Sequence, residues 1–211
     1  QEIEGNFNVT TALRQPGSSI KVVNYALALQ NGYTLATIIP DSPITYKLAG
    51  SPPYSPQNYD GRFHGPVTLR TALASSYNVP AVKVLASLGP EKMAQLGQEM
   101  GITTWNDPSR FGLSLTLGGV EVKMTDLAVV YGVLANSGKK TPLQTIIEVS
   151  DSSGKILWHN PCLISPQEAL NFDKKKFFLP TVKAQEPTCQ EQVIPAGVAF
   201  LLTDVLADNF A

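Results

Sequence analysis

Residues 14–21 predict the start of a helix and read Arg14-Gln15-Pro16-Gly17-Ser18-Ser19-Ile20-Lys21. Pro16 and Gly17 interrupt whatever precedes them, and apolar residues then recur with helical spacing. Ser18 and Lys21 are three positions apart, so we expect them side by side on one helix face. An alcohol is a poor nucleophile at neutral pH, and a partly desolvated amine is a suitable base for it. The stretch therefore predicts an activated serine.

The Ser-x-x-Lys pattern alone is weak evidence. The chain holds 15 serines and 12 lysines in 211 residues, so chance predicts about one such pattern. The chain contains three of them. The other two, Ser137 to Lys140 and Ser152 to Lys155, lie in glycine-containing turns without a helical face. We interpret both as solvated turns.

Composition indicates an ordered globular chain and excludes several functions. Hydrophobic residues make up 43% of the 211 residues and charged residues 16%, so disorder is not expected. A net charge of -1 gives no basic surface for nucleic acid or anionic lipid. No apolar run approaches the roughly 20 residues of a membrane span. The chain begins with Gln1 and not with methionine, which is typical of an excised piece of a longer protein.

The cysteines and histidines predict no metal site and no cofactor. Cys162 and Cys189 are too few and too far apart for a zinc cluster, and only two histidines accompany them. The two cysteines flank a segment with several prolines. They form a disulfide in an oxidising compartment or remain two idle thiols, and the sequence leaves both alternatives open.

The remaining periodicity predicts a mainly helical chain. Residues 31–67 carry no sustained period and predict a long ordered loop, and residues 160–192 predict a surface insertion. Two strands, 145–149 and 156–158, are expected to form a hairpin around residues 151–154. Helices are expected over residues 68–74, 81–88, 90–100, 125–138, with Thr125 as N-cap, and 196–208.

A second motif shares the chemistry of the first. Ser76-Tyr77-Asn78 is the only Ser-x-Asn in the chain, and it lies at an expected helix break just before Pro80. Alone it would be interpreted as a helix-end cap. Together with Ser18 and Lys21 it favours a nucleophilic site with a hydroxyl and a carboxamide.

The order of these motifs resembles the transpeptidase domain of class A, high-molecular-mass, bifunctional penicillin-binding proteins. The similarity extends over nearly the whole chain, except for residues 160–192. It rests on residues 14–21 and on Ser42-Pro43-Ile44, Gln57-Asn58-Tyr59-Asp60-Gly61, Gly65-Pro66-Val67-Thr68-Leu69-Arg70, Ser76-Tyr77-Asn78-Val79-Pro80-Ala81-Val82, Leu117-Gly118-Gly119-Val120-Glu121-Val122 and Ala135-Asn136-Ser137-Gly138.

The resemblance implies a role for each site residue. Ser18 is the expected nucleophile toward the D-alanyl-D-alanine bond of a peptidoglycan stem peptide, and its backbone N–H is half of the oxyanion hole. Lys21 takes the serine proton, Ser76 relays a proton to the leaving amine, and Asn78 binds the substrate backbone. A second stem peptide resolves the acyl-enzyme into a cross-link, and penicillins acylate the same serine.

The family's third motif, Lys-Thr-Gly, is absent from these 211 residues. The nearest string, Lys140-Thr141-Pro142, has proline in place of glycine. We therefore expect a single incomplete domain over residues 1–211, a partial α/β (α+β) transpeptidase fold with the helical part and a few antiparallel strands. Alone it is expected to react poorly.

The resemblance also implies partners and a location. The expected partners are peptidoglycan stem peptides, β-lactams, the remainder of the domain and a glycosyltransferase domain of the parent protein, with no nucleic acid. The expected location is the outer face of the bacterial cytoplasmic membrane, with the parent anchored by an N-terminal transmembrane helix.

Three alternatives remain. One is a noncatalytic cell-wall scaffold that lacks the third motif, and another is a serine β-lactamase or D,D-carboxypeptidase with the same Ser18, Lys21 and Ser76. The third is a Ser-His-Asp hydrolase that uses Asp60 and His64 from one loop, which is disfavoured because a loop histidine is more often a hydrogen-bonding residue than a general base.

Overall fold

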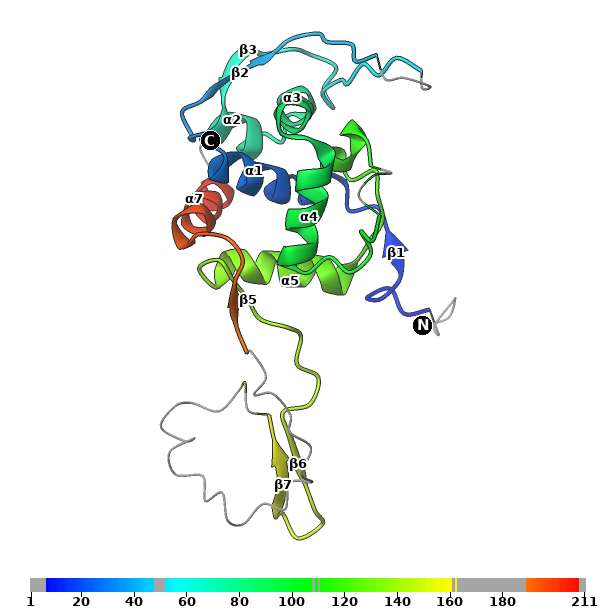
Figure 1. Cartoon of the computed structure of the whole chain (residues 1–211), viewed down its shortest axis with the longest axis vertical. Coiled ribbons are helices and arrows are strands. Elements are labelled where there is room, and N and C mark those ends of the chain that lie inside the picture. Colours follow the sequence, from blue (N-terminus) through cyan, green and yellow to red (C-terminus); the bar gives the residue numbers. More distant parts are fainter. Residues whose placement is uncertain are drawn as a thin grey trace. The chain divides into compact units, whose positions relative to one another are not determined.

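The computed structural model describes residues 7–47, 52–107, 109, 111–160, 162 and 189–208. The chain divides into two compact units (Figure 1). Residues 1–140 and 192–211 form the first, which we call the helical unit, and residues 141–191 form the second, which we call the hairpin unit. Within the described part of the chain, no helix has the length and hydropathy to span a membrane.

The helical unit contains most of the regular structure. Its elements in chain order are β1 (Leu13–Arg14), the 3-10 helix η1 (Gly17–Ile20), α1 (Lys21–Gln30), β2 (Ile38–Asp41), β3 (Gly65–Thr68), α2 (Leu69–Ala74), α3 (Asn78–Leu88), α4 (Pro90–Met100), the 3-10 helix η3 (Leu113–Leu117), β4 (Val122–Lys123), α5 (Met124–Ala135), β5 (Lys139–Lys140) and α7 (Ala196–Ala207). The strand β8 (Glu191–Gln192) pairs with β5.

Helix α1 is the centre of the helical unit. All residues from Lys21 to Ala28 are buried, and α1 contacts α2, α3, α4, α7 and η3 (Figure 1). A helix that is buried on every side must be covered by other elements, and its buried polar side chains need hydrogen-bond partners. Asn24 is fully buried and donates from Nδ2 to the Ala81 carbonyl and to Thr116 Oγ1, both at 2.9 Å. This side chain therefore ties α1 to α3 and η3.

The expected helix break between residues 75 and 78 is confirmed. Ser76 has a φ of +54°, and it ends α2 with two backbone bonds, from Ser76 N to Leu73 O and from Tyr77 N to Ala72 O, both 3.0 Å long. This pair is a Schellman motif with serine where glycine is usual. Helix α3 begins at Asn78, three residues earlier than expected, because Pro80 is tolerated in a first turn.

Helix α5 begins at Met124, and the expected N-cap at Thr125 is wrong. The N-cap is Lys123, whose extended backbone belongs to the strand pair β1–β4, with Leu13 opposite Lys123. The Thr125 N–H donates instead to the Thr10 carbonyl at 3.1 Å. The start of α5 is thus determined by strand pairing, which local cap chemistry does not reveal.

The expectation of a loop without regular structure over residues 31–67 is only partly correct. Strands β2 and β3 pair antiparallel within it, with Ile38 opposite Thr68 and Asp41 opposite Gly65. Each strand contains a proline and is four residues long, so neither shows a strand period. The expected mixed fold with a few antiparallel strands is confirmed, since the described strands pair as two-stranded sheets in a mainly helical chain.

The hairpin unit contains the expected hairpin. Strands β6 (Glu148–Ser150) and β7 (Ile156–His159) pair antiparallel, and Asp151 Oδ1 accepts three hydrogen bonds that close the turn. Cys162 and Cys189 form a disulfide, which resolves the two alternatives left by the sequence. Most of the insertion expected over residues 160–192 lies outside the described residues, and it stays a prediction.

Candidate active site

Ser18 lies in the 3-10 turn η1, which leads directly into the central helix. The expectation that Ser18 and Lys21 share one α-helical face is therefore modified, since α1 itself begins at Lys21. Ser18 is exposed, and within the described residues its hydroxyl makes no hydrogen bond. The neighbouring Ser19 hydroxyl donates to the Pro16 carbonyl at 2.7 Å. Of the two adjacent serines, only Ser18 has a hydroxyl available for a reaction.

Lys21 is a buried amine surrounded by oxygen atoms of the second motif. The residue is 1% exposed. Its Nζ donates to the Ser76 carbonyl at 2.6 Å, to Ser76 Oγ at 3.1 Å and to Asn78 Oδ1 at 2.7 Å. Desolvation by burial lowers the pKa of Lys21 to about 8. The amine is thus held in place and loses its proton more easily than a surface lysine.

The structure brings Lys21, Ser76 and Asn78 into direct contact although they are far apart in sequence. It shows no hydrogen bond between Lys21 Nζ and Ser18 Oγ. Ser76 is held in a left-handed backbone conformation that is unfavourable for any residue with a Cβ. Such strain often accompanies a functional requirement for one side-chain direction.

The turn that carries Ser18 is packed against the loop that follows η3. Gly118 is buried with a φ of +78°, and a Cβ at this position would lie 2.2 Å from the Gly17 nitrogen and 2.5 Å from its Cα and carbonyl oxygen. The backbones at Gly17 and Gly118 therefore pack so closely that no Cβ fits between them. From the other side, the Tyr131 hydroxyl of α5 donates to the Ser19 carbonyl at 2.9 Å. Both contacts restrict the position of Ser18.

A hydrogen-bonded loop supports the second motif from behind. Asn58 is buried, and its Oδ1 accepts the backbone N–H groups of Asn78 and Val79 at 2.8 and 3.1 Å. Its Nδ2 donates to the fully buried carboxylate of Asp41. The first turn of α3 is thus capped by a side chain from the preceding loop, since the N-cap residue Tyr77 makes no such bond.

His64 does not serve as a base for Ser18. Its Nδ1 lies 2.7 Å from Asp41 Oδ2 and its Nε2 lies 3.1 Å from Asp60 Oδ2. The ring also stacks on Tyr77 with centroids 4.1 Å apart. Because a carboxylate occupies each ring nitrogen, neither is available to a serine. This geometry argues against the Ser-His-Asp alternative.

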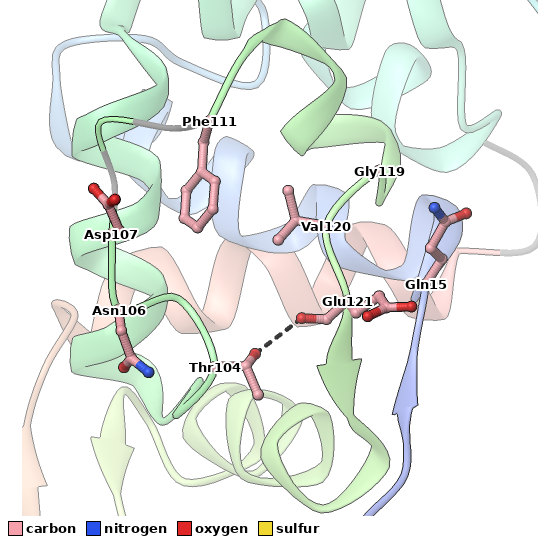
Figure 2. A pocket seen from close by; sticks show the side chains of 8 residues that line it. All are labelled: Gln15, Thr104, Asn106, Asp107, Phe111, Gly119, Val120 and Glu121. Atoms are coloured by element: carbon pink, nitrogen blue, oxygen red, sulfur yellow. Dashed lines mark hydrogen bonds between the residues drawn. The ribbon is translucent and has the colours of Figure 1, made fainter.

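A separate polar pocket of about 580 Å³ lies beside the strand pair β1–β4. Figure 2 shows Asn106 and Asp107 on one side of it and Gln15 and Glu121 on the other. Thr104 Oγ1 donates to the Glu121 carbonyl at 2.9 Å across its floor. None of Ser18, Lys21, Ser76 and Asn78 lines it, so the candidate site is the surface around Ser18 and not this cavity.

A metal-binding cluster is not found in the described residues, where no three histidine, cysteine or acidic side chains converge. The groups that the structure brings together here are a hydroxyl, an amine and an amide. Ser-x-x-Lys together with a second serine-containing triad is the motif pair of serine β-lactamases and penicillin-binding proteins.

Comparison with known proteins identifies the family. The model of the penicillin binding protein transpeptidase domain matches residues 6–209, so the chain belongs to that family and the resemblance seen in its motifs is confirmed.

Similar curated proteins include penicillin-binding protein 1A of Rickettsia bellii, 36% identical over 151 residues, which are 71% of this chain and 19% of the relative. Penicillin-binding protein 2D of Bacillus subtilis is 38% identical over 154 residues, 72% of this chain and 22% of the relative. The chain thus spans about a fifth of the length of these relatives.

Solved structures share the fold. Penicillin-binding protein 1A from Haemophilus influenzae superposes with a TM-score of 0.78 at 27% identity, over 99% of this chain and 32% of that one. The PonA1 protein from Mycobacterium tuberculosis in complex with penicillin V gives a TM-score of 0.72 at 23% identity, over 95% of this chain and 48% of that one. At this identity the second likeness shows the fold alone.

Several residues of the site had no signal of their own in the sequence. Asn58 and Gly118 belong to stretches that carried the family resemblance, but neither was expected to contact the site. Asp41 and Tyr131 lie in segments without a motif. Their partners are between 17 and 112 residues away, so only the tertiary structure brings them together.

Proposed function

We propose that this chain carries the acylating centre of a peptidoglycan D,D-transpeptidase, with Ser18 as nucleophile, Lys21 as its base, Ser76 as proton relay and Asn78 as substrate-binding amide. One observation carries the proposal. The buried Lys21 amine, one turn after an exposed serine, is held by Ser76 and Asn78 together. Family membership supports the same assignment.

The lowered pKa of Lys21 provides a useful fraction of free base. With a pKa of about 8, roughly one amine in ten is neutral at pH 7. A lysine with the ordinary pKa of 10.5 would have a neutral fraction about 300 times smaller at the same pH. A neutral amine accepts the serine proton, and a hydrogen bond to Ser18 is expected to form only once substrate is bound.

The proposed acylation balances as follows. Ser18 Oγ attacks the carbonyl carbon of the penultimate D-alanine while its proton passes to Lys21, and the backbone N–H of Ser18 donates to the developing oxyanion. The carbon–nitrogen bond then breaks, and Ser76 donates its hydroxyl proton to the departing D-alanine nitrogen while it takes up the proton held by Lys21. An amine of a second stem peptide attacks the ester, which forms the cross-link and returns the proton. A β-lactam ring opens on Ser18 by the same first step.

The partners and the location follow from this chemistry. Peptidoglycan stem peptides and β-lactams are the proposed ligands, and the outer side of the bacterial cytoplasmic membrane is the proposed place of action. A glycosyltransferase domain and the remainder of the transpeptidase domain are the proposed covalent neighbours, because the matching relatives are several times longer. No cofactor or metal takes part in the proposed steps.

The proposal is tested by labelling with a fluorescent penicillin. The protein is expressed from its complete gene, and the acylated peptide is identified by mass spectrometry. Ser18→Ala is expected to abolish the label. Ser19→Ala is the matched control, because it removes a hydroxyl from the same turn that is already bonded to Pro16. Retained labelling of Ser18→Ala refutes the nucleophile assignment.

The same experiment separates the alternatives. A labelled protein that cross-links stem peptides acts as a transpeptidase, whereas rapid loss of the label into water indicates a β-lactamase or carboxypeptidase. An unlabelled wild type contradicts the proposed enzyme and favours a noncatalytic scaffold.

A further inference from the structure

Asn58 is a loop residue whose amide is completely occupied. Its Oδ1 accepts from Asn78 N and Val79 N, and its Nδ2 donates to both oxygens of Asp41, at 2.9 and 2.7 Å, and to the Arg62 carbonyl at 2.8 Å. The residue is only 6% exposed. A buried loop amide with every donor and acceptor satisfied is a rigid connection between the segments it joins.

The orientation of this amide is imposed by Asp41. The Asp41 carboxylate is fully buried and only accepts hydrogen bonds, so the NH₂ end of Asn58 must face it. The carbonyl end of Asn58 is thereby directed at the first N–H groups of α3, which have no partner within the helix. Asp41 itself is held at the end of β2 by the backbone N–H and ring of His64, at 2.9 and 2.7 Å.

Two adjacent loop residues together determine where Asn78 lies. Asn58 holds its backbone N–H, while the Gln57 carbonyl accepts from Asn78 Nδ2 at 2.9 Å. With its NH₂ group bound there, Asn78 presents Oδ1 to Lys21 Nζ at 2.7 Å. In the part of the chain that the structure describes, every acceptor of the Lys21 amine belongs to the segment from Ser76 to Asn78. The position of that segment therefore affects the amine directly.

We propose that Asn58, oriented by Asp41, is a positioning residue for acyl transfer: it fixes the start of α3 and, through Asn78, the place of the Lys21 amine. This inference rests on the proposed function of Ser18 and Lys21. Asn58 touches neither Lys21 nor Ser18, so its effect is expected on the rate of acylation and not on the identity of the nucleophile.

A charge exchange tests the pair. Asn58→Asp places two carboxylates against each other, and Asp41→Asn presents an NH₂ group or a weaker acceptor to the same amide. Each single variant is expected to slow acylation by a fluorescent penicillin about 10- to 100-fold, with the loss in the acylation step and not in initial binding. Combining both substitutions restores a donor facing a carboxylate, and the rate is expected to recover to within about tenfold of the wild type. Recovery is incomplete because the Arg62 carbonyl loses its donor.

Asp60→Asn is the matched control. It alters a neighbouring loop carboxylate that bonds His64 Nε2 and Arg62 N but does not contact Asn58. It is expected to label at the wild-type rate. All variants are expressed from the complete gene, and only those with a cooperative thermal transition enter the kinetic comparison.

A second measurement does not depend on activity. Asn58→Ala is expected to speed hydrogen exchange of the Asn78 and Val79 amides at least tenfold, while amides within α4 remain unchanged. Unchanged exchange at these two amides overturns the inference. The inference is also overturned if the wild type is labelled and both single variants are acylated as fast as the wild type. A wild type that takes up no label refutes the proposed function instead, so the two failures are distinguishable.

Discussion

Gly118→Ala tests whether the backbone contact behind Ser18 positions the nucleophile. The new Cβ would lie 2.2 Å from the Gly17 nitrogen, whereas ordinary contacts to a Cβ begin near 3.4 Å. Relief of this overlap forces the two segments apart, and the atoms involved are backbone, so no flexible side chain can yield. Because Gly17 precedes Ser18, the displacement is transmitted to the nucleophile.

A misplacement of about 1 Å in a reacting group costs roughly 10²-fold in rate, which corresponds to about 2.7 kcal/mol in the activation free energy. We therefore expect the second-order rate constant of acylation by penicillin to fall about 100-fold. The assay is stopped-flow or gel-based labelling of the protein expressed from its complete gene. The free energy of unfolding is also expected to fall, by more than the roughly 1–2 kcal/mol that a φ of +78° costs alone, because the overlap with Gly17 adds to the strain.

Gly32→Ala separates the two effects. Gly32 has a similar φ of +88°, and a Cβ there meets nothing within 4 Å. It carries the same backbone strain without the clash, so we expect a smaller loss of stability than in Gly118→Ala and an unchanged acylation rate. The reasoning is refuted if Gly118→Ala reacts at the wild-type rate or if both variants lose activity equally.

Two further predictions concern the second motif and the base. Ser76→Gly relieves the left-handed strain but removes the hydroxyl that accepts from Lys21 Nζ, so it should leave the free energy of unfolding within about 1 kcal/mol of the wild type while labelling is lost. Ser137→Gly, at a φ of +52°, removes strain without touching Lys21, so it should raise the free energy of unfolding by about 1 kcal/mol and keep labelling; a destabilised Ser137→Gly protein would contradict the cost assigned to this conformation. Acylation should rise with pH around a midpoint near 8, because only neutral Lys21 is a base. The pKa of Lys21 is lower in the folded state than in the unfolded chain, so the free energy of unfolding should also rise between pH 8 and 10.5. Lys21→Met should remove that rise. An acylation rate that does not change between about pH 6 and pH 9 would rule out Lys21 as the base.

Local signals in the sequence predicted most helices of the helical unit. Helix α4 has Pro90 at its first position and Gly101 after its end, and its boundaries agree with the expectation. The hairpin of β6 and β7 was predicted from its Asp151 to Gly154 turn. These elements depend on residues close in the chain, so propensity and cap chemistry are sufficient for them.

Other elements depend on partners that the sequence does not reveal. The pair β2–β3 joins strands separated by a long loop, and each contains a proline that weakens the strand pattern. The start of α5 depends on the pair β1–β4, so the local cap at Thr125 was misleading. In both places a tertiary contact outweighs a local preference.

The sequence by itself determined which chemical groups this protein carries: a serine and a lysine at helical spacing, and one Ser-x-Asn before a proline. Only the tertiary structure decided how these groups are arranged. Burial of α1 on every side desolvates Lys21, and the break between α2 and α3 places Ser76 and Asn78 against its amine. The physical reason is that desolvation and hydrogen bonding arise from neighbours that are distant in the sequence, so no local spacing encodes them.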